Sequence, residues 1–450
     1  MRKVLLALPL VASASWAGST YYAGSQAQPA YEKLLADLNQ AASGMFILES
    51  ASYSAGFTES SAITNVKLLH IEEPVIFQLQ HSINHSPVGT DPEGARFSAS
   101  SITTTINADS LQDNDIKALF AEFDGGQPFT LYTDVGFTGN VTSDLHLSSL
   151  SLEDNGASFS FDGGRFEAVN NAGKIDINGT IGQIAFNTYS GNLFALAESS
   201  AQFDLLQVAN GVYSGEQRIV FPKMTMTDAT NGSTISIANS VFTSHANLNG
   251  STLDSESNFS VAEIQSPLPL NSLSFDTRFS GLSISGLENY TATNGRLMRM
   301  PRDEMVADRN LGVDMLNAYK GLLTPGMKLT NKVILNNDGG DVISDFGIEF
   351  IGDGSTSGID NMLTVADVLQ ALTINVGLQA DTAAIDLTPA AMFMMHPMAQ
   401  QYITHDNGRY NSNISVADLT LSVNGAQQSL EYYFGDKLYE PLDFSAFSDF

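Results

Sequence analysis

The chain has 450 residues, and its 49 acidic against 20 basic side chains give a formal net charge of −29. This charge argues against a phosphate-binding surface and excludes nucleic acid as a partner. Hydrophobic residues make up 43% of the chain, which is enough for a large core, while Ser, Thr, Asn and Gly supply a polarity that favours strands and turns. The absence of cysteine excludes disulfides and thiolate metal sites.

The first 24 residues have the order of an export signal. Arg2 and Lys3 precede an apolar run at 4–11, and small residues follow at 12–15. The uncharged stretch 4–24 is also long enough to span a bilayer. We therefore expect either a cleaved signal peptide or an uncleaved membrane anchor, with the rest of the chain on the far side of the membrane.

Apolar spacing predicts a helix from Pro29 through Tyr31, Leu34, Leu35 and Leu38 to a stop at Gly44. From there to about residue 300, two-residue alternation predicts half-buried strands of an antiparallel meander, interrupted by a short helix at 115–123. The alternating segments include 158–161, 174–177, 183–186, 202–205, 224–227, 234–237 and 282–285. The hairpin turns predicted between them are Asp154 to Gly156, Asp162 to Gly164, Asn170 to Gly173, Asn178-Gly179 and Asn231-Gly232.

The pattern becomes more mixed after residue 300, where 302–323 has helical spacing. We expect a β-rich domain at 25–300 with an N-terminal helix, and an α+β part at 301–450. The boundary between them is gradual, and the alternative is one continuous fold. The elements predicted in the second part are strands at 332–335, 347–351, 372–378 and 419–423, and helices at 365–371 and after Thr388-Pro389.

These elements predict a mainly β fold with a few helices, of the α+β class. The sheet is expected to be large, antiparallel and twisted, or a sandwich or curled sheet, packed by amphipathic helices. About five helical segments are too few to cover the apolar sides of so many alternating strands. The apolar faces must therefore meet one another or face a hydrophobic ligand.

Several short motifs together resemble the YdgA/YihF-like family of Gram-negative envelope proteins (DUF945). They are Trp16-x-Gly18 with Tyr22-x-Gly24, Tyr53 to Phe57, His85-Ser86-Pro87, Gly125 to Phe129, Gly136 to Gly139, Phe161 to Phe166, and 419–425 with Leu430. Two of them depart from the family pattern: the second has one residue fewer before Phe57, and Ser86 replaces a glycine. The resemblance implies an envelope location and favours a retained inner-membrane anchor, but it carries no reaction, cofactor or catalytic residue.

No catalytic constellation is predicted. The string from Gly281 to Gly286 lacks the spacing of a nucleophile elbow, and no phosphate-binding glycine loop is present. On an extended strand His81 and His85 would lie about 13 Å apart, too far to share one metal ion.

Met392, Met395 and His396 are weak candidates for a soft-metal site, because thioethers and imidazole bind Cu(I). Methionines more often fill irregular gaps in a core, so we expect no metal and no cofactor.

We therefore expect a periplasmic, non-enzymatic envelope protein. If its N-terminal segment is retained, that segment would anchor the protein in the inner membrane. Its apolar sheet face would bind a lipid or a hydrophobic segment of a partner protein. The alternative is a structural or assembly role as a homodimer, and an enzyme of unrecognised type is a third reading.

Overall fold

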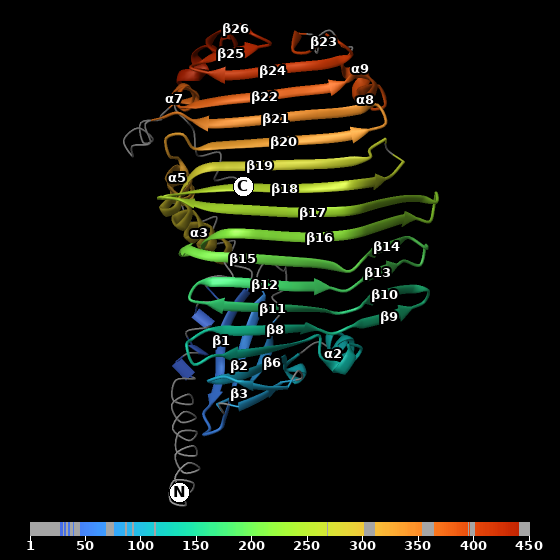
Figure 1. Ribbon diagram of the computed structural model, residues 1–450, viewed down its shortest axis with the longest axis vertical. Coiled ribbons are helices and arrows are strands. Elements are labelled where there is room, and N and C mark those ends of the chain that lie inside the picture. Colours follow the sequence, from blue (N-terminus) through green and yellow to red (C-terminus); the bar gives the residue numbers. More distant parts are fainter. Residues whose placement is uncertain are drawn as a thin grey trace, which may run out of the picture. The chain divides into compact units, whose positions relative to one another are not determined.

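The computed structural model describes residues 28–29, 31–32, 35–36, 39, 46–68, 76–85, 88–91, 94–111, 114–267, 269–300, 311–352, 364–394, 396 and 401–440. It confirms the predicted class, because 24 strands form one large antiparallel sheet that is not closed, with few helices (Figure 1). The chain divides into two compact units. The predicted signal or anchor lies outside the described residues, and the predicted division near residue 300 stays a prediction.

Unit 1 comprises residues 1–187, 200–206 and 294–300. Its main strands pair antiparallel in the order β1 (Phe46–Ser54), β2 (Glu59–Leu68), β3 (Ile76–Asn84), β6 (Ser100–Ile106), β7 (Phe129–Val135), β8 (Val141–Leu147), β11 (Gly164–Asn171) and β12 (Lys174–Ile181). A separate hairpin is formed by β4 (Val88–Asp91) and β5 (Gly94–Phe97). Helix α2 (Asn114–Ala121), flanked by the short turns η1 (Ala108–Ser110) and η2 (Asp124–Gly126), confirms the helix predicted at 115–123.

Three neighbouring strands of unit 1 are interrupted at matching positions. Beyond the interruptions run β9 (Leu150–Asp154), β10 (Ala157–Phe161) and β13 (Ile184–Asn187), with β10 paired to both others. The segment Asp162 to Gly164, predicted as a hairpin turn, instead separates β10 from β11, which pair with different partners. Gly163 has a φ of 82°, and a Cβ there would lie 2.6 Å from the carbonyl oxygen of Leu147, so glycine is required.

The turn predicted at Asn178-Gly179 is also wrong, because both residues lie inside β12. Gly179 pairs with Phe166 of β11, and a Cβ on Gly179 would overlap the Phe166 ring. The ring therefore covers a strand glycine, an aromatic packing that stabilises glycine in a sheet. The predicted turns at Asn155-Gly156 and Ala172-Gly173 are confirmed, with positive φ at all four residues.

The core of unit 1 lies between the first strands and the N-terminal helical segment. Of the predicted helix, Tyr31 and Leu35 are described as helical and are buried, whereas Leu34 and Leu38 lie outside the described residues. Tyr31 and Leu35 pack with the buried residues Leu48, Ala62, Val66 and Ile83. The described part of the predicted apolar stripe, Tyr31 and Leu35, therefore packs against β1 to β3.

Unit 2 comprises residues 188–199, 207–293 and 301–450. Its strands are β14 (Leu193–Leu196), β15 (Ser199–Ala209, shared with unit 1), β16 (Val212–Asp228), β17 (Ser233–Asn249), β18 (Thr252–Gln265), β19 (Ser272–Ser283), β20 (Lys328–Asn337), β21 (Gly340–Phe350), β22 (Leu372–Asp381), β23 (Thr404–Asp406), β24 (Arg409–Ala417), β25 (Thr420–Val423) and β26 (Ala426–Ser429). From β16 to β22 each strand pairs antiparallel with the next, and β24 follows β22 (Figure 1). The predicted strands after residue 300 are confirmed in this meander.

The helices of unit 2 lie near the ends of these strands (Figure 1). They are α3 (Ile284–Arg299, whose last turns belong to unit 1), α5 (Leu311–Leu322), α7 (Val365–Gln370), α8 (Thr382–Asp386), α9 (Ala390–Met394) and α10 (Glu431–Phe434), followed by the 3-10 turn η4 (Gly435–Tyr439). Helix α7 begins at a capping box in which Thr364 and Asp367 satisfy each other's backbone N–H groups. Helices α5, α7 and α9 match predicted helices, although residues 302–310 of the first lie outside the described residues.

The strand predicted at 282–285 is wrong in its second half. Strand β19 ends at Ser283, whose Oγ accepts the backbone N–H of Gly286 at 3.1 Å, and α3 begins at Ile284. The cap that this serine provides stabilises the helix, and this effect is stronger than the strand preference of the local alternating pattern. Gly286 also allows a close approach of α5, because a Cβ there would overlap the carbonyl group of Gly321.

Candidate functional site

Strand register in unit 2 lines up an apolar row across one face of the sheet. We define the central apolar row as the cross-strand partners Ile219, Phe242, Phe259, Phe275 and Val333, on β16 to β20. Four of the five side chains are half-buried and Phe275 is 42% exposed. Alternation of side chains along each strand places the residues two positions away on the same face. The face therefore presents aligned hydrophobic side chains that are incompletely covered.

Two flanking parts of this face are more deeply packed. At one end, buried Phe350 and Ala371 pack with Leu323, Met327 and Leu372. Around β24 and β25, the buried residues Ala366, Leu430 and Leu438 pack with Val416, Leu419 and Leu421. Helical segments thus cover these parts of the face, as predicted for amphipathic helices, whereas the central apolar row on β16 to β20 is less deeply buried.

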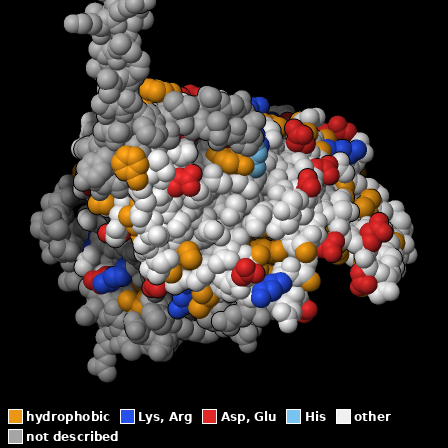
Figure 2. All heavy atoms as spheres, turned by 90° about the horizontal axis from the view of Figure 1, so that it is seen from below, with side chains coloured by type: hydrophobic (Ala, Val, Ile, Leu, Met, Phe, Trp, Pro, Cys, Tyr) orange, Lys and Arg blue, Asp and Glu red, His pale blue; other side chains and the backbone are white. Residues whose placement is uncertain are grey.

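Hydrophobic side chains are also exposed elsewhere on the molecule. On the face drawn in Figure 2 they lie in separate groups among polar atoms, with acidic side chains spread between them. Phe186 of β13, for example, is 44% exposed, a value close to that of Phe275. Scattered apolar residues are ordinary on a soluble surface, so alignment across strands distinguishes the central apolar row.

The opposite face of the same strands is polar and charged. One row of cross-strand partners runs Glu216, His245, Glu256, Arg278, Thr330, Gly347 and Asn375. His245 Nδ1 lies 3.4 Å from Glu216 Oε1, and Arg278 Nη2 lies 2.7 Å from Glu256 Oε1. These pairs are exposed and contribute little to stability.

A groove of about 470 Å³ opens on this polar face. Its lining comes from four consecutive strands, β19 to β22, and consists of Asp276, Arg278, Lys328, Thr330, Asn331, Lys332, Asp345, Phe346, Gly347 and Asn375. The volume is within the range of small-molecule sites. We call it the polar groove.

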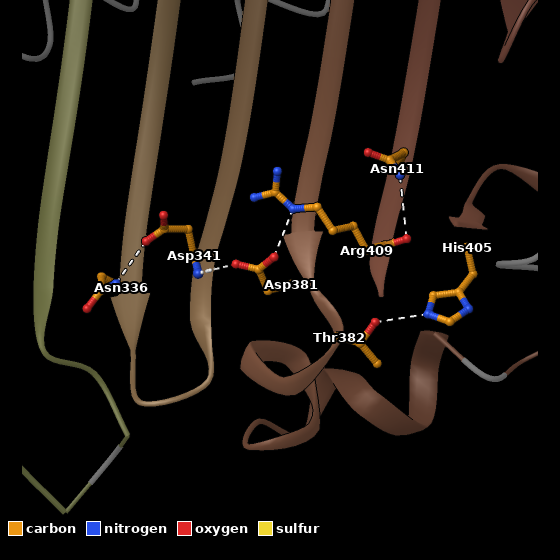
Figure 3. A network of polar contacts seen from close by, with 7 residues as sticks. All are labelled: Asn336, Asp341, Asp381, Thr382, His405, Arg409 and Asn411. Carbon is orange, nitrogen blue, oxygen red and sulfur yellow. Dashed lines mark hydrogen bonds and ion pairs between the residues drawn. The ribbon is translucent and has the colours of Figure 1, made fainter. Parts of the chain in front are cut away.

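A polar network joins three chain segments at one end of the unit 2 strands (Figure 3). The carboxylate of Asp381 accepts Arg409 Nε at 2.8 Å and the backbone N–H of Asp341 at 2.9 Å. The hydrogen bond from Asp341 and the charge of Arg409 hold the pKa of Asp381 below its usual value. Nearby, Thr382 Oγ1 lies 2.9 Å from His405 Nε2. The network connects the β20–β21 hairpin, the end of β22 and the start of β24. Its role is therefore structural.

The two histidines predicted not to share a metal have hydroxyl partners instead. His81 lies between Thr64 Oγ1, at 2.7 Å from Nε2, and Thr104 Oγ1, at 2.8 Å from Nδ1. Burial lowers the pKa of His81 to about 4. His85 is fully buried, its Nε2 lies 2.7 Å from Ser60 Oγ, and burial lowers its pKa as well.

A buried carboxylate in unit 1 is that of Asp144 of β8. Arg165 donates to both of its carboxylate oxygens, at 2.9 and 2.7 Å. His146 Nε2 lies 3.0 Å from Oδ2. Burial opposes ionisation, yet the bonds and charges of Arg165 and His146 outweigh it and lower the pKa of Asp144.

The weak metal candidates are only partly described by the structure. Met392 of α9 is 76% exposed, His396 follows the helix, and Met395 lies outside the described residues. Within the described part of the chain, no group of three or more His, Cys, Asp or Glu side chains could hold a metal ion. The soft-metal hypothesis stays untested, because that search does not consider methionine.

Sequence reasoning missed both the central apolar row and the polar groove as defined sets of residues. Each depends on register between strands up to 114 positions apart, from Ile219 to Val333. One local signal was present: Gly347 and Gly377 interrupt strands that otherwise alternate, and strand glycines often mark a close approach or an open floor.

Comparison with known proteins gives a family and no closer relative. A family model described as "Bacterial protein of unknown function (DUF945)" matches residues 1–431. No curated protein and no solved structure matches the chain. Among the described residues, helices with the length and hydropathy needed to cross a bilayer are absent.

Proposed function

Because the chain belongs to DUF945, a bacterial family of unknown function, we propose its role from the geometry of the sheet. The protein is a non-enzymatic binding protein whose apolar face in unit 2 holds the acyl chain of a lipid. The observation that carries this proposal is the central apolar row, in which Phe275 is 42% exposed.

The dimensions of the row support an acyl chain as occupant. Neighbouring strands lie about 4.8 Å apart, so the four intervals from β16 to β20 span about 19 Å. One leaflet of a bilayer has a hydrocarbon thickness of about 15 Å, half of a core about 30 Å thick. A single acyl chain laid across the strands would therefore contact most side chains of the row.

The polar clusters of unit 1 support a role without catalysis. Ser60 and His85 resemble a nucleophile and base, but Ser60 is 5% and His85 0% exposed, so a substrate cannot reach them. The Asp144–Arg165 pair is satisfied by its own hydrogen bonds.

The proposed location is the periplasm of a Gram-negative envelope, as in the YdgA/YihF-like proteins that the motifs resemble. The export-signal order of the first 24 residues supports it. N-terminal sequencing of the protein from a membrane fraction and a soluble periplasmic fraction tests both export and cleavage. A chain that begins at Met1 and is recovered from the cytoplasm would contradict the proposed location.

The acyl-chain proposal is tested by Phe275→Ser in the full chain, with binding of a fluorescent fatty acid as the readout. We expect at least a tenfold loss of affinity, because a hydroxyl replaces a large apolar contact in the row. Phe186→Ser is the matched control, since it removes an equally exposed phenylalanine from unit 1. Equal affinities of the wild type and Phe275→Ser would contradict the proposal.

Native mass spectrometry distinguishes the other roles. Copurified lipid on a monomer supports the acyl-chain proposal. A dimer without lipid and without fatty-acid binding supports the assembly role instead, and a stably copurified protein that Phe275→Ser releases supports a hydrophobic protein segment as the occupant.

A further inference from the structure

The polar groove brings three cations together in a chain with few of them. Arg278 of β19 and Lys328 and Lys332 of β20 line it, although the chain has 49 acidic and only 20 basic residues. The net charge argues against a broad phosphate-binding surface, so the groove is a local exception. Because they lie on neighbouring strands, the three side chains can approach one ligand.

Their own partners leave these cations largely available. Arg278 contacts Glu256 through Nη2, and Lys328 Nζ lies 3.8 Å from Glu349 Oε2. Among the residues that the structure describes, none forms a hydrogen bond or an ion pair with the side-chain ammonium group of Lys332. An exposed ammonium group that is not paired can bind an anion at little cost in lost contacts.

The two carboxylates of the groove are directed away from Lys332. Asp276 accepts Asn258 Nδ2 at 2.6 Å, which holds it toward β18. Asp345 lies over the neighbouring strand, because a Cβ on Gly377 of β22 would overlap its carboxylate. Although both residues pair with Lys332 in register, neither forms an ion pair with it.

The floor of the groove is open at Gly347. A Cβ there would meet Thr330 Cγ2 at 3.7 Å and Leu329 O at 3.8 Å, which are ordinary contacts. A side chain at this position would therefore fill space without displacing its neighbours. The groove thus owes part of its depth to a glycine that the strand itself does not require.

We propose that the polar groove binds a small molecule that carries a phosphate group. Three cationic side chains can share the three terminal oxygens of a phosphate, whereas a carboxylate offers two. The groove volume of about 470 Å³ exceeds the needs of an isolated ion, so the ligand includes an organic part, with Thr330 and Asn375 as hydrogen-bonding groups beside it. This site lies on the face opposite the central apolar row and is independent of the acyl-chain proposal.

The test is calorimetric titration of the full chain with glycerol 3-phosphate, with inorganic phosphate and with vesicles containing phosphatidylglycerol. We expect the wild type to bind glycerol 3-phosphate, and Lys332→Ala and Gly347→Val each to weaken binding at least tenfold. Lys223→Ala is the matched control, because it removes one exposed lysine of the same unit, on β16, and should leave the affinity unchanged. Circular dichroism checks that each variant keeps its β structure.

Each outcome decides the proposal. Binding of vesicles without binding of glycerol 3-phosphate, if lost in both groove variants, assigns the phosphate to a lipid headgroup. Binding of inorganic phosphate alone, with equal losses in Lys332→Ala and Lys223→Ala, would show that only net charge matters and would overturn the proposal. Absence of binding by all three probes would overturn it as well. Phe275→Ser should leave phosphate binding intact, which separates this site from the acyl-chain site.

Discussion

Acidification should weaken unit 1 through His81, and the effect can be calculated from its surroundings. The imidazole lies between the hydroxyls of Thr64 and Thr104, while the Tyr31 ring lies 5.6 Å away, centroid to centroid. Burial lowers its pKa from 6.5 to about 4. The unfolded chain therefore binds more protons than the folded chain between these two values, and stability falls as the pH decreases through this range.

The magnitude follows from the size of this change in pKa. One pKa unit corresponds to about 1.4 kcal/mol, so protonation of His81 should cost the folded state about 3 kcal/mol between pH 7 and pH 4. The full contribution is present above pH 6.5. Other groups with lowered pKa values, His85, Asp144 and Asp381, add their own losses in acid.

The variant His81→Gln isolates the contribution of this residue. The glutamine amide can hydrogen-bond to both threonines but does not titrate. Between pH 7 and pH 4, the free energy of unfolding measured with urea should therefore decrease by about 3 kcal/mol less for His81→Gln than for the wild type. His405→Gln, which alters an exposed histidine, should behave as the wild type does. Circular dichroism gives the unfolding curves, and proton NMR of the His81 ring gives its pKa directly. An NMR titration midpoint near 6.5, or identical pH dependence of wild type and His81→Gln, would refute the reasoning.

Two further predictions concern packing and charge. Asp144→Asn should lower the free energy of unfolding by about 2 kcal/mol, because it weakens a two-point contact with a half-exposed Arg165. Thermal unfolding at pH 7 measures the loss, and an unchanged unfolding midpoint would contradict the prediction. Gly286→Ala should cost about 1–3 kcal/mol by forcing α3 and α5 apart, whereas Gly321→Ala, whose Cβ would meet Gly286 Cα at 3.5 Å, should be neutral or stabilising. Equal unfolding midpoints of these two variants would contradict the proposed close approach.

Local patterns predicted the strands well, because alternation records which side chains face the core. The pattern at 234–237, for example, lies inside β17, and the turn at Asn231-Gly232 closes the hairpin before it. The incorrect turn at Asn178-Gly179 has a tertiary cause, since the Phe166 ring covers a glycine that would otherwise favour a turn. The strand predicted at 282–285 failed because one hydroxyl, that of Ser283, caps a helix.

The candidate sites were less accessible from sequence than the strands. Alternation predicted that an apolar face would exist, but the alignment of Phe275 with Val333 depends on the register between β19 and β20. The same alignment brings Arg278 and Lys332 into one groove. Side chains separated by more than 50 positions carry no shared local signal, so only the register of the folded sheet identifies them.

The order of strands in unit 2 has a consequence for biosynthesis. Because β16 to β22 each pair with the next strand along the chain, every strand that emerges finds its partner already in place. Such a sheet can grow vectorially from its N-terminal side, and assembly can start before the last residues of the chain have emerged. At each stage only the newest strand offers unpaired backbone groups to aggregation.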